Sequence, residues 1–206
     1  MIEGVHIWRA ALDEAGWPGA EELPAADRQR AESFLRREPA RRWVAARWAL
    51  RRTLARYLDQ PAAAIELETD GRGKPRLTSG AERLQFNLSH SAGLALVAVT
   101  ERRPVGIDVE IVEPREDLVG LAERGLPAEE AAAVRAADPD QRLDAFYAAW
   151  VRHEARSKCL GTGLGSPAPP AAVAIASIEA DPGYAAAVAV LGSAIGPLQC
   201  RTLRAG

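Results

Sequence analysis

Two acidic residues lie two positions apart in the segment Gly106-Ile-Asp-Val-Glu110. Its apolar alternation predicts a strand, and residues two apart on a strand face the same side, so Asp108 and Glu110 project together. Two neighbouring carboxylates repel each other unless a cation or a proton intervenes. Oxygen ligands favour a hard ion such as Mg²⁺, usually held by one or two carboxylates and substrate phosphates. The alternative is an ordinary strand with an acidic outer face.

A third carboxylate lies on a helix predicted over residues 140–160, which Gly161 would end. At about 100° per residue, the apolar residues of this helix form one stripe. They are Leu143, Phe146, Tyr147 and Trp150. Glu154 is the next residue on the stripe, where a buried carboxylate is costly unless it is paired or binds a metal. Lys158 follows one turn later, so a simple surface Glu–Lys pair is the alternative.

The segment Asn87-Leu-Ser-His-Ser91 could bind an anion. No G-x-S-x-G surrounds Ser89, and a Ser directly before its His seldom has the geometry of a catalytic triad. The hydroxyl of Ser89 and the imidazolium of His90 can both donate hydrogen bonds to a phosphate. A purely structural role is the alternative. Eight arginines between residues 36 and 56 likewise predict either an anion site or a solvated basic face.

Together these segments supply three acidic groups able to hold one magnesium ion, a lysine beside them and several separate cationic groups. Cleavage of a phosphate or pyrophosphate needs this combination of charge neutralisation and positioning. The residues therefore favour a phosphate- or pyrophosphate-cleaving transferase.

The elements that must position these residues alternate without a regular βαβ order, which predicts an α+β fold. Helices are expected over residues 24–35, 41–59, 128–137 and 140–160, with Pro39 separating the first two. Strands are expected over residues 4–8, 65–68, 94–100, 105–112, 172–178, 184–191 and 198–203. The turn near Arg103 is the expected seam between two halves.

Composition narrows the class of protein. The 206 residues include 26 Lys and Arg against 28 Asp and Glu, a net charge of −2, which argues against a dedicated nucleic-acid binder. The two cysteines, Cys159 and Cys200, form no CxxC pair, so we expect a reducing compartment. We expect no signal peptide, and the apolar run 184–196 is too short to span a bilayer. A soluble cytoplasmic protein is the expectation.

Four motifs occur in order along the chain. They are Gly71-x-Gly-Lys-Pro75, Phe86-Asn-Leu-Ser-His-Ser91, Gly106-Ile-Asp-Val-Glu110 and Trp150-x-x-x-Glu-x-x-x-Lys158-x-x-Gly-x-Gly163. Each motif is weak alone, but together the sequence resembles the 4′-phosphopantetheinyl transferases of the Sfp type over nearly its whole length. The resemblance implies a pseudo-twofold α+β fold with coenzyme A in the cleft between two similar halves, residues 1–102 and 103–206. The first half would hold the adenine and 3′-phosphate side of coenzyme A, and the second the magnesium and catalytic residues.

The resemblance also implies a reaction, in which the phosphopantetheine arm of coenzyme A moves to a serine of an acyl or peptidyl carrier protein. Adenosine 3′,5′-bisphosphate would be released. Asp108, Glu110 and Glu154 would bind Mg²⁺ on the pyrophosphate, and Lys158 would contact that pyrophosphate. Glu154 and Lys158 are the two candidates for the base that deprotonates the serine. A lysine near carboxylates tends to stay protonated, so we favour Glu154.

Further residues would bind coenzyme A by resemblance. Arg42, Ser89 and His90 would hold the 3′-phosphate, Lys74 would lie beside the nucleotide, and Arg30 would make a further phosphate contact.

Two departures from the family pattern concern specificity. His153 stands where a lysine usually precedes the glutamate, which would make a second cation near the phosphates dependent on pH. Arg124-Gly-Leu126 replaces an aromatic pair in a loop that helps to meet the carrier, so docking of the carrier is in question. The choice among fatty-acid, polyketide and nonribosomal-peptide carriers stays open.

We expect the transferase to work as a monomer and to have no nucleic-acid or membrane partner. Three other hypotheses compete with that of an active transferase. The first is a catalytically inactive protein that binds coenzyme A or a carrier. The second is a magnesium-dependent phosphohydrolase, and the third is a nucleic-acid module built on the arginine-rich helix.

Overall fold

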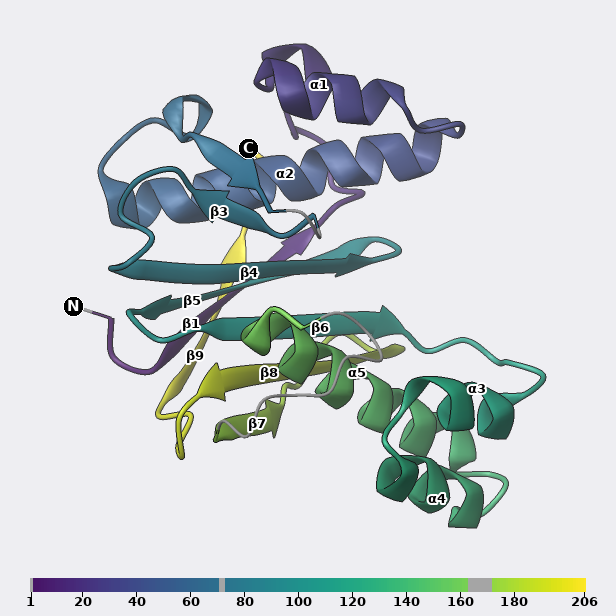
Figure 1. Ribbon diagram of the computed structural model, residues 1–206. Helices are drawn as coiled ribbons and strands as arrows, with labels where there is room; N and C mark the ends of the chain where they lie inside the picture. The colour runs from purple at the N-terminus through teal and green to yellow at the C-terminus, as the bar shows by residue number, and fades with distance from the viewer. Residues whose placement is uncertain (1, 71–72, 163–171) are drawn as a thin grey trace.

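The computed structural model describes residues 2–70, 73–162 and 172–206. Gly71 and Gly163, which belong to two of the motifs, lie outside the described residues. Figure 1 shows a mixed α+β architecture, with a long helix in the upper part of the view and two short helices, residues 118–125 and 128–136, at the lower right. The predicted fold class is confirmed.

The first half of the chain forms strands and helices before residue 102. They are β1 (Val5–Ala11), α1 (Ala25–Glu32), α2 (Arg37–Leu58), β2 (Leu67–Thr69), β3 (Pro75–Leu77), β4 (Leu84–Ser91) and β5 (Leu94–Glu101), with short 3₁₀ turns at Ala20–Glu22 and Ala62–Ala64. Pro39 does not separate α1 from α2 as expected. It lies in the first turn of α2, where a proline is tolerated because its missing N–H would have no intrahelical partner.

The second half adds three helices and four strands. They are β6 (Val105–Ile111), α3 (Leu118–Gly125), α4 (Ala128–Ala136), α5 (Arg142–Leu160), β7 (Val173–Ser177), β8 (Tyr184–Leu191) and β9 (Leu198–Leu203). Gly161 adopts a left-handed conformation with φ 67° and ends α5, which confirms the predicted stop. Helix α3 and strands β3 and β4 were not predicted.

Two sheets form the centre of the fold. One has the strand order β4-β5-β1-β9 and the other the order β6-β8-β7, while β2 and β3 form a small hairpin. Strand β9 pairs in parallel with β1, so the last strand of the chain is hydrogen bonded into the sheet of the first half. The division at residues 102/103 stays a prediction.

The two sheets pack face to face between two helices. Val5 and Ile7 of β1 pack against Ile107 and Val109 of β6, whereas alternate residues such as Trp8 face α2 on the other side of their sheet. Helix α5 covers the outer face of the second sheet in the same way. The period-two alternation of strand side chains explains how each sheet contributes to two cores. The long helices thereby flank a double layer of strands (Figure 1).

Candidate active site

The candidate site lies where the edge strands of the two sheets meet. Strands β4 and β6 run side by side in the same direction (Figure 1), yet they belong to different sheets. Side chains of β4, rather than its carbonyl groups, accept hydrogen bonds from backbone N–H groups of β6. The donor-to-acceptor pairs are Ile107 N to Asn87 Oδ1 at 2.9 Å, Val109 N to Ser89 Oγ at 3.4 Å, and Ile111 N to Ser91 Oγ at 3.1 Å. These three contacts form a side-chain ladder, in which every second residue of β4 contacts every second residue of β6, and it sets the register of the two strands.

Gly106 allows helix α5 to lie directly against strand β6. A Cβ atom at this position would lie 2.1 Å from the carbonyl oxygen of Ala155 and 2.4 Å from the backbone nitrogen of Cys159. Any side chain would therefore force the helix away from the strand. Glycine at the start of the acidic segment brings Glu154 and Lys158 of α5 over the face of β6 that carries Asp108.

Lys158 and Asp108 form the ion pair at the centre of the site. Lys158 Nζ lies 2.6 Å from Asp108 Oδ1 and donates a second hydrogen bond of 3.0 Å to Ser89 Oγ. Ser89 Oγ in turn donates to Asp108 Oδ1 at 2.9 Å. Asp108 is only 2 % exposed, and a carboxylate buried to this extent would be costly without these partners.

The carboxylates of Glu110 and Glu154 share this environment. Burial raises the pKa of Glu110, and the charges of Asp108 and Glu154 raise it further, against the lowering effects of Ser91 and Lys158. Burial also raises the pKa of Glu154, which Lys158 lowers and Asp108 raises. The structure thus brings the three predicted carboxylates close enough to influence one another.

The donor chemistry of the site suits a hard cation. Asp108 Oδ2 and Glu154 Oε1 are buried and have no hydrogen-bond partner within residues 2–70, 73–162 and 172–206, which is costly for a charged oxygen unless a cation binds it. Among the residues that the structure describes, however, no three His, Cys, Asp or Glu side chains are arranged as a complete metal site. The oxygen chemistry fits Mg²⁺, and Oδ1 of Asp108 is in contact with Lys158 Nζ in this arrangement.

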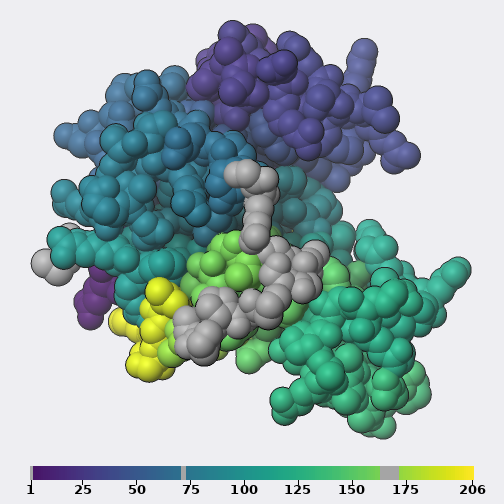
Figure 2. All heavy atoms as spheres, viewed as in Figure 1, coloured from purple at the N-terminus to yellow at the C-terminus, as the bar shows by residue number. Residues whose placement is uncertain are grey.

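A cavity of about 320 Å³ opens beside this cluster. It is lined by Lys74, Pro75 and Asn87 from the first half and by Glu154 and Lys158 from the second. Figure 2 shows the first half, in purple to teal, above the green residues of the second half. Both halves therefore contribute to one pocket that contains cationic and anionic side chains, as a site for a charged ligand requires.

Lys74 is half-buried against the end of helix α5. Its Nζ donates hydrogen bonds of 2.7 Å to the carbonyl oxygen of Lys158 and 3.4 Å to that of Val105. Burial is the main reason that the pKa of Lys74 is lowered. Lys74 thus contacts the backbone of Lys158, in addition to lining the cavity.

The other predicted phosphate ligands are distributed unevenly. His90 is exposed on β4, where surrounding protein atoms and then the charge of Lys158 lower its pKa. Arg42 is held by Asp13, whose Oδ1 and Oδ2 lie 3.0 and 2.7 Å from Arg42 Nε and Nη2. Arg30 is exposed on α1 and makes local contacts, a hydrogen bond of 3.2 Å to Ser33 Oγ and a stack over Phe34.

The residues of the two departures lie around α5. His153 is half-buried next to Glu154. A Cβ atom at Gly125 would lie 2.6 Å from Cζ3 of Trp150, so the indole ring occupies the space that a larger residue there would need. The glycine in Arg124-Gly-Leu126 is therefore matched to Trp150.

Sequence reasoning missed Asn87 and Ser91. Ser91 Oγ donates to Glu110 Oε2 at 2.8 Å, as Ser89 does to Asp108. The polar residues at positions 87, 89 and 91 were the available signal, because residues two apart on a strand share one face.

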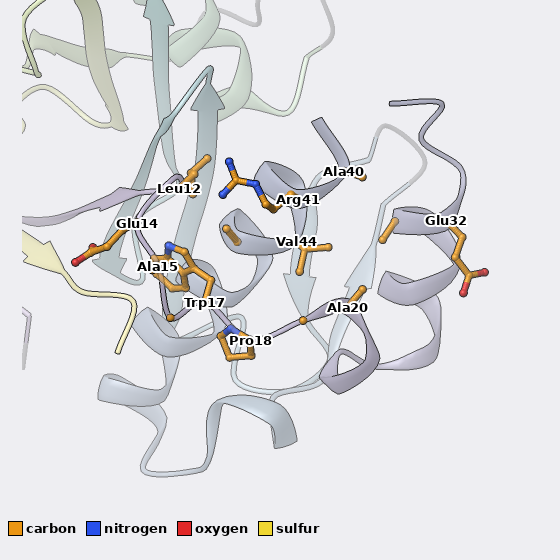
Figure 3. Close-up of a pocket in the computed structure, with 14 residues that line it drawn as sticks. Leu12, Glu14, Ala15, Trp17, Pro18, Ala20, Glu32, Ala40, Arg41 and Val44 are labelled. Carbon is orange, nitrogen blue, oxygen red and sulfur yellow. The ribbon is translucent and has the colours of Figure 1, made fainter. Parts of the chain in front are cut away.

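A larger and more apolar cavity of about 510 Å³ lies elsewhere in the first half. Figure 3 shows Trp17 and Pro18, from the chain that follows β1, on the same cavity as Val44 and Arg41 of α2. Its lining residues are different from those of the pocket beside Glu154.

Comparison with known proteins identifies the family. The model of the 4′-phosphopantetheinyl transferase superfamily matches residues 104–196. A second model, described as 4′-phosphopantetheinyl transferase, N-terminal, matches residues 8–102. Each half of the chain therefore matches a model from the same class of transferases.

Individual relatives agree with the family models. The chain is 35% identical over 169 residues to 4′-phosphopantetheinyl transferase HetI of Nostoc sp. strain PCC 7120, covering 80% of this chain and 71% of HetI. It is 32% identical to 4′-phosphopantetheinyl transferase AcpT of Salmonella typhimurium, covering 75% of each protein. It is also 32% identical to L-aminoadipate-semialdehyde dehydrogenase-phosphopantetheinyl transferase of Xenopus laevis, covering 68% of this chain and 49% of the relative. The protein belongs to the 4′-phosphopantetheinyl transferase superfamily, as the four motifs predicted.

One further finding concerns membranes. Within the described ranges, no helix has both the length and the apolar character needed to cross a bilayer.

Proposed function

We propose that this enzyme transfers 4′-phosphopantetheine from coenzyme A to a serine hydroxyl of an acyl or peptidyl carrier protein. The observation that supports this most directly is the Lys158–Asp108 ion pair, with Glu110 and Glu154 in the same electrostatic environment, beside a cavity lined by both halves. In the reaction, the serine oxygen forms a bond to the phosphorus that carries pantetheine. The bond from that phosphorus to the bridging oxygen breaks, and adenosine 3′,5′-bisphosphate leaves.

Asp108, Glu110 and Glu154 are the proposed magnesium ligands. Mg²⁺ bound on the pyrophosphate would neutralise the charge that builds on the leaving bisphosphate. Their oxygen chemistry and the unpartnered Asp108 Oδ2 and Glu154 Oε1 support this assignment. Asp108 must share its carboxylate between Lys158 and the metal, or release Lys158 to the pyrophosphate.

Glu154 is the proposed base, directly or through a water molecule. Its carboxylate has two oxygens, so one can face the metal while the other accepts the proton of the serine hydroxyl. Burial raises the pKa of Glu154, which makes it a stronger base than an exposed glutamate. Lys158 Nζ lies 2.6 Å from Asp108 Oδ1, and an ammonium group at this place suits a contact with the pyrophosphate.

The remaining cations are assigned to coenzyme A. Ser89, His90 and Arg42 would hold the 3′-phosphate, Lys74 would lie beside the nucleotide from its place on the cavity wall, and Arg30 would add a peripheral phosphate contact. All five of these side chains come from the half 1–102, whereas the magnesium and catalytic residues come from 103–206. We propose that the protein acts as a cytoplasmic monomer.

The test is incubation of the protein with coenzyme A, Mg²⁺ and a panel of apo carrier proteins from fatty-acid, polyketide and nonribosomal-peptide systems. The expected result is a gain of one phosphopantetheine mass on at least one carrier, dependent on Mg²⁺. Glu154→Gln should lower kcat by at least about 100-fold, the range of a general base, and excess Mg²⁺ should not restore it. Cleavage of coenzyme A without a carrier would instead indicate a phosphohydrolase. Full turnover by Glu154→Gln would exclude both roles proposed for Glu154.

A further inference from the structure

The polar face of β4 has a second set of contacts beyond the proposed phosphate ligands. Ser89 Oγ accepts a hydrogen bond from Val109 N and donates one to Asp108. Ser91 Oγ accepts from Ile111 N at 3.1 Å and donates to Glu110 Oε2 at 2.8 Å. Each serine hydroxyl therefore contacts both the backbone of β6 and the carboxylate of the preceding residue on that strand.

This arrangement restricts how each carboxylate can turn. A serine hydroxyl has one proton to donate and lone pairs with which to accept. The N–H group of β6 therefore fixes the position of the serine oxygen, while the hydroxyl proton points at the carboxylate. The side chain of Glu110 is longer than that of Asp108 and half-buried at the sheet edge, and its Oε2 accepts a hydrogen bond from Ser91 Oγ. Groups that hold a ligating carboxylate in this way commonly govern metal affinity.

We propose that Ser91 is a positioning residue. From the half 1–102, it would orient the carboxylate of Glu110 toward Asp108 and Glu154, which belong with Glu110 to the half 103–206. The proposal rests on the magnesium site of the proposed function. The side chain of Asn87, two residues before Ser89 on β4, accepts a hydrogen bond from the N–H of Ile107 and makes none to a carboxylate of β6. Ser91 therefore combines alignment of the two strands with orientation of an acidic side chain, whereas Asn87 contributes alignment alone.

The main experiment measures binding of Mg²⁺ by calorimetry in the presence of coenzyme A and without a carrier protein. Ser91→Ala removes the hydroxyl and should weaken Mg²⁺ binding by about 10- to 100-fold, the usual effect of losing a group that orients a metal ligand. Ser91→Thr keeps the hydroxyl and should recover most of the affinity. Ser177→Ala, the same change at an exposed site on β7, serves as the matched control and should bind Mg²⁺ as the unmodified protein does.

A double-mutant cycle distinguishes positioning from general loss of structure. If Ser91 acts through Glu110, then Ser91→Ala should weaken Mg²⁺ binding no further in a Glu110→Gln background. Urea unfolding of each variant reports the cost of losing the Ile111 N–H partner separately. Should Ser91→Ala fail to fold, Ser91→Cys replaces the hydroxyl with a thiol, a much weaker hydrogen-bond partner of similar size, and the same loss of affinity is expected.

Two results would overturn the proposal. One is an unchanged Mg²⁺ affinity in folded Ser91→Ala or Ser91→Cys, and the other is an equal further loss in the Glu110→Gln background. Failure of the proposed function looks different, because the unmodified protein would then show no Mg²⁺-dependent transfer and no Mg²⁺ binding with coenzyme A.

Discussion

Asp13 grips the guanidinium group of Arg42 with both carboxylate oxygens, and Arg41 Nη2 lies 2.6 Å from the same carboxylate. The charge and hydrogen bonds of Arg42 and Arg41 lower the pKa of Asp13. A carboxylate and a phosphate use the same two-pronged contact with arginine. Asp13 therefore occupies the donors that the proposed 3′-phosphate contact of Arg42 would need.

Loss of the Asp13 charge, which leaves Arg42 paired with the more exposed Glu38 at 2.8 Å, should improve binding of coenzyme A. We predict that Asp13→Asn lowers the KM for coenzyme A by about two- to fivefold, the equivalent of a partly exposed ion pair. The KM for dephospho-coenzyme A, which lacks the 3′-phosphate, should not change. Glu14→Gln removes an equal charge from the next residue, which is half-buried and pairs with Arg204 at 3.9 Å, and is the matched control. An equal effect on both cofactors, or a higher KM for coenzyme A, would show that Asp13 does not compete with the phosphate.

Gly106 should be intolerant of any side chain. Because a Cβ atom would meet the backbone of α5 at 2.1 Å, Gly106→Ala should displace the helix and cost about 1–3 kcal/mol in the free energy of unfolding. It should also lower kcat by more than the loss of stability explains, since Glu154 and Lys158 move with the helix. Ile107→Val, in the inter-sheet core of the same strand, should cost about 0.5–1.5 kcal/mol with normal kcat. Normal kcat in folded Gly106→Ala would contradict this account.

Asp27 pairs with two buried arginines between α1 and α2. Its oxygens lie 2.9 Å from Arg47 and 2.8 Å from Arg51, and Arg51 is 2 % exposed. We predict that Asp27→Ala lowers the free energy of unfolding by about 3–5 kcal/mol, because two guanidinium groups would stay buried without their anion. Glu123→Ala, which breaks the exposed pair with Arg135, should cost less than about 1 kcal/mol. Urea unfolding of both variants makes the comparison, and similar losses would refute the prediction.

His6 should make stability depend on pH. Trp8 Nε1 donates to the hydroxyl of Tyr57 at 2.7 Å, and that hydroxyl lies 2.8 Å from Nδ1 of His6, within hydrogen-bond distance. Burial, followed by the charges of Arg201 and the N-terminus, lowers the pKa of His6 from its ordinary value of 6.5. The unfolded chain therefore takes up the proton first as the pH falls.

The sign of the effect follows from that difference. Well above pH 6.5, titration of His6 does not change the free energy of unfolding. Below about pH 6.5, the free energy of unfolding falls by up to about 1.4 kcal/mol per pH unit for one proton, until His6 of the folded protein is protonated as well. Urea midpoints of the unmodified protein and of His6→Gln, measured from pH 8 to pH 5, should converge as the pH falls. The other titrating groups are common to both proteins, so parallel curves would exclude His6 as the cause.

Much of the architecture was accessible from local patterns. Helix α5 was predicted from the stripe that ends at Glu154, and the structure buries Phe146 and Tyr147 of that stripe. The left-handed Gly161 ends α5 as expected. Helix α3 was missed because it is only eight residues long and contains glycines, which oppose helix formation. The early start of α2 was missed because Pro39 was taken as a helix breaker although it occupies the first turn.

The candidate site divides in a similar way. Residue types and spacing along single elements identified Asp108, Glu110, Glu154 and Lys158, because strand and helix periods place such residues on known faces. Pairing between distant elements has no period that a single sequence reveals. The ion pair of Arg42 with Asp13, the contact of Lys74 with the end of α5 and the bond from Ser91 to Glu110 became visible only in the folded chain. Each of these contacts depends on how sheets and helices pack, and packing is set by the summed burial of many side chains rather than by local spacing.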